Sequence, residues 1–200
     1  SPPVIGILTY PIGNRYKKKV IILSNYRELV LMARKSGILM YVFTPHQIDY
    51  NSGRIKGITL LPGKSINRFV WKWCTFPLPD VVYNRVPNRL AESSQFFQKA
   101  RIFLTENKGI PFFNPMFIDK WKCYNWLIND SSLSYYLPET RLLSGKTLKK
   151  MLRKYTSVFL KPAAGSLGLG IARIQRVADK YRYSILTHKG YCLLSDVSEQ

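Results

Sequence analysis

The first part of the chain alternates short apolar runs with an amphipathic segment. Residues 4–10 form an apolar run that stops at a Pro-Ile-Gly break, and residues 26–35 carry apolar side chains at helical spacing. Residues 38–43 form a second apolar run after a glycine. A strand, a helix and a strand in this order predict an α/β unit with a parallel sheet.

More strands and another helix are predicted before residue 115. The strand-like pieces are separated by Pro-Gly and Pro-Leu-Pro breaks, and they carry the β-branched and aromatic side chains that suit sheet interiors. They cover residues 54–61, 66–76 and 80–85, and a helix is expected over residues 91–107. We therefore expect an α/β domain over about residues 1–115.

The pattern then changes to helices followed by closely spaced strands. Asp119 and Ser144 each precede an amphipathic segment and are placed to cap a helix, the first of which covers residues 119–128. Strands are expected at residues 157–161, 170–176, 181–187 and 191–194. Their short connections predict an antiparallel meander. Residues 116–200 should therefore form a module of helices and an antiparallel sheet.

Charge is the most unusual bulk feature of the chain. It contains 31 Lys and Arg residues but 11 Asp and Glu residues, which gives a formal net charge of +20. Such a field attracts nucleotides, nucleic acids, anionic surfaces and acidic substrates without distinguishing them. The chain has neither an apolar run of about 18 residues nor the features of a secretion signal, so we expect a soluble cytoplasmic protein without a membrane span. The widely spaced Cys74, Cys123 and Cys192 predict buried thiols rather than a zinc site or disulfides.

Two common nucleotide fingerprints are absent. The sequence S-G-K-T at residues 144–147 resembles the end of a P-loop, but the first glycine of that motif would fall on Thr140, so we interpret it as a helix start. A glycine fingerprint after the first strand is also missing, which disfavours a generic Rossmann binder of dinucleotides or phosphosugars.

The run F-L-K-P-A-A-G-S-L-G-L-G at residues 159–170 is the strongest candidate for anion binding. Its glycines permit positive φ, so that successive N–H groups can converge on an anion. Ser166 adds a hydroxyl donor and Lys161 an ammonium group. The alternative is a glycine-rich hairpin beside an ordinary surface lysine, and the spacing alone leaves both interpretations open.

Several motifs in the same order resemble a known family. The glycine run is similar to the loop that closes over ATP in ATP-grasp enzymes, and D-K-W with a later L-P-E-T is similar to the signature that precedes it. More narrowly, D-V-V-Y-N-R-V-P-N-R, F-N-P-M-F-I-D-K-W and K-P-A-A-G-S-L-G-L-G-I resemble the YheC/YheD family of endospore-coat-associated ATP-grasp proteins. These motifs occupy residues 80–89, 113–121 and 161–171, and the likeness covers nearly the whole chain.

The resemblance implies ATP as cofactor, with Lys120 and Lys161 on its phosphates and a loop acting as a lid. The lid residues are Gly165, Ser166, Leu167, Gly168 and Gly170. It also implies a fold: an α/β, Rossmann-like pre-ATP-grasp domain, followed by the first, helix-plus-antiparallel-sheet subdomain of an ATP-grasp fold that is incomplete at the C-terminus. Two ammonium groups and a row of amides can neutralise a triphosphate.

The pre-ATP-grasp domain of such proteins usually helps to bind the second substrate. Tyr83, Asn84, Arg85 and Arg89 lie at or just past the end of a predicted strand, and we expect them to contact an anion or carboxylate there. An equally open alternative is that these side chains anchor a loop. The identity of the substrate does not follow from either.

Carboxylates for a magnesium site are scarce. The family holds Mg²⁺ with carboxylates and an asparagine on a later subdomain, whereas the acids after Thr156 are Asp179, Asp196 and Glu199. We therefore expect no metal site within this chain and Mg²⁺ only with a missing C-terminal part. The chain should be a catalytically incomplete N-terminal part of an ATP-dependent carboxylate–amine or similar ligase, which phosphorylates a carboxylate to an acylphosphate before a nucleophile attacks it.

A second hypothesis is a basic, non-catalytic spore-coat or polyanion-binding structural protein. Binding to a polyanion that falls steeply with salt and is indifferent to ATP would favour it. Nucleic acid is not an expected partner, because no recognition motif is present and the W-K-W and Y-Y pairs suit sheet faces and core better than base stacking. The expected partners are ATP, an unidentified carboxylate or amine, and components of the endospore coat.

Overall fold

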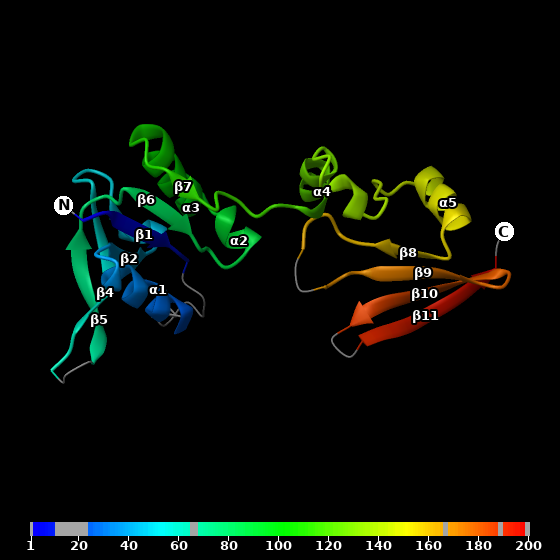
Figure 1. The fold of residues 1–200 in the computed structure, drawn as a ribbon, viewed down its shortest axis with the longest axis horizontal. Helices are drawn as coiled ribbons and strands as arrows, with labels where there is room; N and C mark the ends of the chain where they lie inside the picture. Colours follow the sequence, from blue (N-terminus) through cyan, green and yellow to red (C-terminus); the bar gives the residue numbers. More distant parts are fainter. Residues whose placement is uncertain (1, 11–23, 65–67, 166–167, 188–189, 199–200) are drawn as a thin grey trace. The chain divides into compact units, whose positions relative to one another are not determined.

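The chain forms two compact units that divide between Phe117 and Ile118. In the computed structural model shown in Figure 1, the described residues are 2–10, 24–64, 68–165, 168–187 and 190–198. Each unit is considered by itself below.

The first unit is built on a sheet in the order β3-β4-β2-β1-β6-β7, with β5 paired to β4. The strands are β1 (Val4–Leu8), β2 (Leu39–Phe43), β3 (Ile48–Asp49), β4 (Arg54–Pro62), β5 (Phe69–Phe76), β6 (Val81–Asn84) and β7 (Phe112–Phe113). β1 is parallel to both β2 and β6, and β6 is parallel to β7. This parallel centre confirms the α/β prediction, while β3, β4 and β5 add antiparallel strands at one side.

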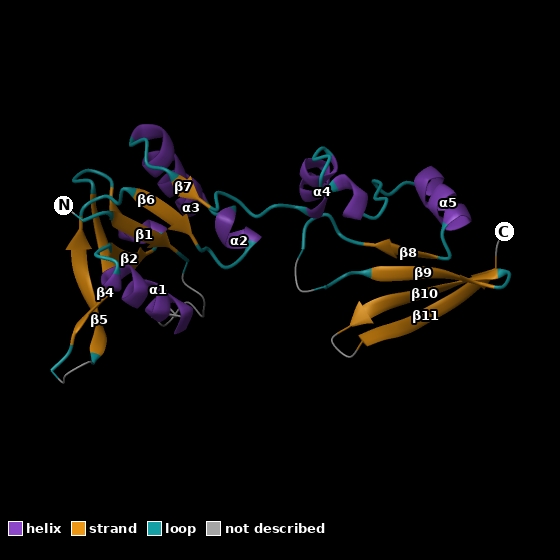
Figure 2. Ribbon diagram, viewed as in Figure 1, coloured by secondary structure: helices purple, strands orange, loops and turns teal. Residues whose placement is uncertain are grey.

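Side-chain alternation along the strands builds a separate core on each face of this sheet. On one face, Ile7 of β1 packs in a cluster with Tyr26 and Val30 of α1 (Ser24–Lys35). On the other face, Leu8 packs in a cluster with Phe97 of α3 (Gln95–Ile102). Figure 2 shows these two helices on opposite sides of the sheet. Continuous apolar sequence in β1 follows from burial on both faces.

The single helix predicted over residues 91–107 is wrong. The structure has α2 (Arg89–Glu92), α3 and a π-helical turn (Phe103–Asn107) in its place. The reason is a second helix cap: the Ser94 side chain accepts a hydrogen bond from the Phe97 N–H at 3.2 Å, so the chain stops and restarts there. α2 has its own cap in Asn88, whose Oδ1 accepts from the Ala91 N–H at 2.9 Å.

The second unit consists of two α-helices and an antiparallel sheet. The helices are α4 (Lys120–Ile128) and α5 (Gly145–Lys154), with a 3₁₀ turn at Ser134–Tyr136, and the strands are β8 (Ser157–Leu160), β9 (Ala172–Val177), β10 (Lys180–Thr187) and β11 (Gly190–Ser198). Consecutive strands pair throughout in the order β11-β10-β9-β8, which confirms the predicted meander.

Both predicted caps of this unit are confirmed. The Asp119 side chain accepts a hydrogen bond from the Lys122 N–H at 2.7 Å, and Ser144 Oγ accepts one from the Thr147 N–H at 3.1 Å. The Thr147 hydroxyl lies 2.8 Å from the Ser144 N–H, which completes a capping box. The S-G-K-T sequence is therefore the start of α5, as predicted.

The two units differ in how much apolar surface they bury. Among the described residues, the buried hydrophobic side chains of the second unit are Leu152, Val158 and Ala172, and all the others belong to the first. The prediction of buried thiols is wrong for Cys192, which is exposed on β11, while Cys74 and Cys123 are partly buried. None of the helices in the described parts of the chain combines the length and apolar character that crossing a bilayer requires.

Candidate functional site

The glycine loop connects β8 to β9, and its three described glycines have the positive φ that the sequence predicts. Gly165, Gly168 and Gly170 have φ of +143°, +75° and +73°, values that residues other than glycine rarely adopt. A Cβ atom on Gly170 would also lie 3.0 Å from Cγ of Pro162. The loop therefore requires glycine at these positions. Ser166 and Leu167, which the sequence also assigns to the lid, lie outside the described residues.

Lys120, the first residue of α4, is bonded to this loop at three points. Its N–H donates to the Ala163 carbonyl at 2.9 Å, and its Nζ donates to the carbonyl oxygens of Pro162 at 3.1 Å and Gly165 at 3.0 Å. Hydrogen bonds from an ammonium group are among the stronger kind. The start of α4 and the first half of the loop are therefore held together.

Lys161 directly precedes Pro162, whose carbonyl oxygen accepts from Lys120 Nζ, so the two lysines that the family resemblance assigns to ATP both adjoin the start of the loop. The Lys161 side chain is exposed at the start of the loop, just after β8 ends at Leu160. Backbone with positive φ next to a lysine can receive an anion.

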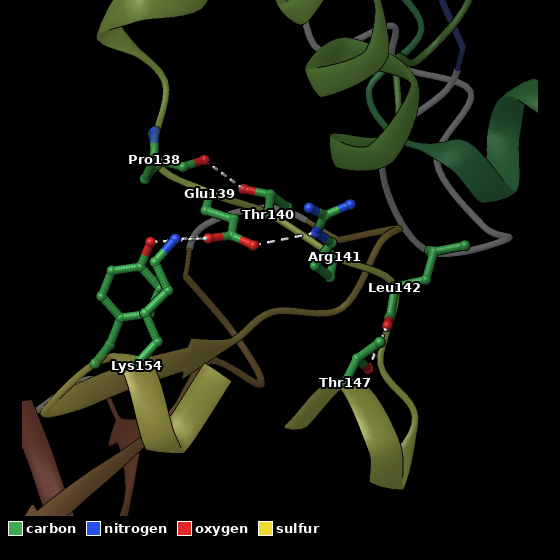
Figure 3. A network of polar contacts seen from close by, with 8 residues as sticks. Pro138, Glu139, Thr140, Arg141, Leu142, Thr147 and Lys154 are labelled. Atoms are coloured by element: carbon green, nitrogen blue, oxygen red, sulfur yellow. Dashed lines mark hydrogen bonds and ion pairs between the residues drawn. The ribbon is translucent and has the colours of Figure 1, made fainter. Parts of the chain in front are cut away.

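Glu139, in the L-P-E-T segment, organises a polar network that Figure 3 shows. Its Oε2 accepts hydrogen bonds from Lys154 Nζ at 2.7 Å and from the Tyr155 hydroxyl at 2.9 Å, and its Oε1 accepts from Arg141 Nε at 3.2 Å. The bond from Lys154, then those from Tyr155 and Arg141, lower the pKa of Glu139 to about 2. The network ties the segment before α5 to the end of that helix.

Sequence reasoning gave Glu139 no role beyond its place in the motif. The signal that could have found it is its isolation: it is the one acid between Asp130 and the basic helix that follows. A carboxylate in such surroundings has several cations to pair with.

In the first unit, Arg85 follows β6 and is fixed to the neighbouring strand. Its N–H donates to the Leu8 carbonyl at 2.8 Å. Its carbonyl oxygen accepts from Thr9 Oγ1 at 3.4 Å and from the Tyr26 hydroxyl at 3.3 Å. The main chain of Arg85 is therefore held at the carboxyl ends of β1 and β6.

The side chains of Tyr83 and Arg85 share a shallow cavity. Arg85 Nη1 lies 3.4 Å from the Tyr83 hydroxyl, and its guanidinium carbon lies 5.6 Å from the centre of the Tyr83 ring. The cavity has a volume of about 410 Å³ and is also lined by Glu28, Leu29 and Met32 of α1. Of the four residues predicted to face a second substrate, these two are brought together.

Asn84 and Arg89 make other contacts. Asn84 is 3% exposed, and its Oδ1 accepts from the Val86 N–H at 3.2 Å. Arg89 Nη1 donates to the Phe117 carbonyl at 3.1 Å, and its guanidinium lies 5.7 Å from the Phe117 ring. The structure therefore places both side chains in contacts that support the fold, and a substrate role for them stays a prediction.

Metal ligands are not gathered in the described parts of the chain. No three His, Cys, Asp or Glu side chains lie there in an arrangement that could hold a metal ion.

Comparisons with known proteins agree with the motifs. A model of the YheC/D like ATP-grasp family matches residues 109–196. The chain is 31% identical over 179 residues to the endospore coat-associated protein YheD of Bacillus subtilis (strain 168), an alignment that covers 87% of this chain and 38% of that protein. It is 28% identical over 145 residues to the endospore coat-associated protein YheC of the same organism, covering 72% and 39%.

The chain thus spans about two fifths of the length of these curated relatives. The family match covers α4, α5, the glycine loop and nearly all of the antiparallel sheet, which are the elements that carry Lys120 and Lys161. These matches confirm the resemblance seen in the sequence motifs. The chain belongs, through residues 109–196, to the YheC/D-like ATP-grasp family.

Proposed function

We propose that the second unit binds ATP at the glycine loop, with Lys120 and Lys161 on the phosphates. The observation that carries this proposal is the contact of Lys120 Nζ with the carbonyl oxygens of Pro162 and Gly165. This contact places the ammonium group of Lys120 against the loop, and Lys161 lies at the start of the same loop. ATP use by the ATP-grasp family supports the nature of the ligand.

The loop supplies the remaining charge stabilisation in this proposal. Its lid residues, Gly165, Ser166, Leu167, Gly168 and Gly170, would direct N–H groups at the phosphate oxygens once ATP is bound. Lys120 would exchange its carbonyl acceptors for phosphate, which carries far more negative charge. Two ammonium groups and several amides on one triphosphate suit phosphoryl transfer, a reaction dominated by positioning and electrostatics.

For the longer protein, we propose an ATP-dependent carboxylate–amine or similar ligase. Transfer of the γ-phosphoryl group of ATP to a carboxylate gives an acylphosphate and ADP, and attack by an amine then forms the amide and releases phosphate. Mg²⁺ would be needed for this step in the family. The described residues contain no cluster of three metal-ligating side chains, so no step through Mg²⁺ is assigned to them.

The same proposal gives the two units their roles. The first would be a pre-ATP-grasp domain that holds the second substrate, with Tyr83, Asn84, Arg85 and Arg89 as its candidate contacts. The second would be the first subdomain of the ATP-grasp fold. The names of the two relatives support association with the endospore coat.

Titration of ATP by calorimetry into the wild-type chain and its Lys161→Ala and Lys120→Ala variants tests the site. We expect each variant to bind ATP at least about tenfold more weakly, because each loses a charge-assisted contact to phosphate. Lys149→Ala, which removes an exposed charge from α5, is the matched control and should bind ATP as the wild type does.

Inorganic tripolyphosphate separates this proposal from the hypothesis of a general polyanion binder. If tripolyphosphate binds as tightly as ATP and the Lys149 variant loses as much affinity as the Lys161 variant, net charge rather than the loop is responsible and the ATP site is refuted. The family match gives no support to the polyanion alternative.

A further inference from the structure

The carboxyl ends of β1 and β6 form the point where the sheet changes direction. From β1 the chain crosses through α1 to β2 on one side, whereas β6 and β7 lie on the other side of β1. In open α/β sheets, ligands bind outside the carboxyl ends of the strands at such a switch point. The register pairs Leu8 with Asn84, so Arg85 stands directly beyond this edge.

Both the main chain and the side chain of Arg85 make contacts that order this residue without a ligand. The two hydroxyls that hold its carbonyl belong to Thr9 and Tyr26, which are 3% and 2% exposed, and these hydroxyls lie 3.2 Å from each other. Its guanidinium contacts both the hydroxyl and the ring of Tyr83. A side chain that is already ordered loses little conformational entropy when it binds, which favours affinity.

The part of the same cavity that α1 lines carries the opposite charge and apolar surface. Glu28 lines it from α1, one helical turn before Met32, and Leu29 lies between them. Leu29 and Met32 are 36% and 58% exposed, unlike the buried face of α1 that packs on the sheet. Among the described residues, no ion pair joins Glu28 to Arg85. A carboxylate, a guanidinium and two apolar side chains therefore border one hollow of about 410 Å³.

We propose that this cavity binds a zwitterionic α-amino acid with an apolar side chain. Arg85 receives the α-carboxylate, for which its forked donors are suited. Glu28 receives the α-ammonium group, and Leu29 and Met32 contact the hydrocarbon chain. A simple anion would leave Glu28 unused, and a simple amine would leave Arg85 unused. Binding itself needs no nucleotide, but the role of the amino acid as ligase substrate rests on the proposed function.

Three probes with the same hydrocarbon chain test the proposal: L-norleucine, hexanoate, which lacks the ammonium group, and pentylamine, which lacks the carboxylate. Calorimetric titration without nucleotide should show that norleucine binds at least about tenfold more tightly than either analogue. Arg85→Gln should weaken norleucine and hexanoate binding about tenfold. Glu28→Gln should weaken norleucine binding about tenfold and leave hexanoate binding unchanged.

Two exposed residues of the same unit provide matched controls. Arg54→Gln at the start of β4 and Glu106→Gln in the π-helical turn remove the same charges outside the cavity and should leave norleucine binding unchanged. Circular dichroism melts establish that each variant is folded. If Arg85→Gln does not fold, Arg85→Lys replaces it, because lysine keeps the charge but not the fork, and it must still weaken norleucine binding.

The proposal is overturned if wild-type protein binds none of the probes at millimolar concentration, if hexanoate or pentylamine binds as tightly as norleucine, or if the controls lose as much affinity as the cavity variants. ATP is titrated in parallel. Norleucine binding without ATP binding would leave this inference standing and refute the ATP site, and ATP binding without norleucine binding would do the reverse.

Discussion

The ammonium group of Lys120 donates a hydrogen bond to the carbonyl oxygen of Gly165 at 3.0 Å, so the first residue of α4 holds the middle of the glycine loop. The ammonium group has three N–H donors, and the carbonyl oxygens of Pro162 and Gly165 accept from it at two contacts. In the proposed ATP site, phosphate oxygens would compete with these two carbonyl oxygens for the ammonium group of Lys120.

Lys120→Ala should loosen the loop in the protein without nucleotide. The lost bonds are exposed, so we expect a change of about 1 kcal/mol, or about fivefold faster amide exchange at Ile171, whose N–H donates to the Gly168 carbonyl. Hydrogen–deuterium exchange measures this directly. Lys122→Ala removes a neighbouring exposed charge of α4, and an equal acceleration in that variant would show that charge alone, not the contact, holds the loop.

Gly170→Ala should destabilise the second unit. The residue has φ of +73°, and an alanine there costs about 1–2 kcal/mol in addition to its close approach to Pro162. Gly145→Ala is the matched control, because Gly145 begins α5 with no neighbour within 4 Å of an added Cβ, and alanine favours helices. Thermal unfolding should show a loss for the first variant and none for the second. Equal effects would mean that the loop tolerates a side chain.

Glu139 should make the second unit sensitive to acid. Its pKa of about 2 in the folded chain is below its ordinary value of 4.5, so its ion pairs stabilise the fold fully above about pH 4.5. That stability is lost as the pH falls from 4.5 toward 2, because the unfolded chain takes up the proton first. The melting temperatures of wild type and Glu139→Gln should therefore converge over this range. Glu106→Gln is the control, and the same convergence there would contradict the assignment to Glu139.

Tyr41→Phe should destabilise the first unit. The Tyr41 side chain is fully buried, stacks on Phe76 with ring centres 4.2 Å apart, and donates to the Pro77 carbonyl at 2.8 Å. Loss of the hydroxyl leaves that carbonyl without this donor, at a cost of about 1–2 kcal/mol in the free energy of unfolding. Urea unfolding measures it. Tyr135→Phe, at a residue that is 90% exposed, should change the unfolding free energy by much less, and an equal loss would rule out the hydrogen bond from Tyr41 as the cause.

Local signals in the sequence predicted the elements that local forces determine. The caps at Asp119 and Ser144, the positive φ of the loop glycines and the meander all follow from neighbouring residues. The strands β3 and β7 were not predicted, since each has two residues and exists through its pairing with a distant strand. The bonds of Lys120 to Pro162 and of Glu139 to Lys154 also join residues far apart in the chain.

The four residues of the first unit that were predicted to contact a second substrate show the same limit of sequence-based prediction. Tyr83 and Asn84 are adjacent on one strand, so their side chains must leave it on opposite faces. Only Tyr83 lines the cavity, while Asn84 is buried. The sequence shows that side chains alternate between the two faces of β6. Which face carries a cavity depends on α1, whose exposed Leu29 and Met32 also line that cavity.

The described residues within 118–200 form a small core, which has a practical consequence for calorimetry. Since stability rises with the apolar area removed from water, this half of the chain should melt at a lower temperature than the half that contains Tyr41. A compound bound to folded protein raises the melting temperature of the part that holds it. A calorimetric melting scan with two transitions would then show which unit binds each compound. We expect ATP to raise the temperature of the first transition and norleucine that of the second.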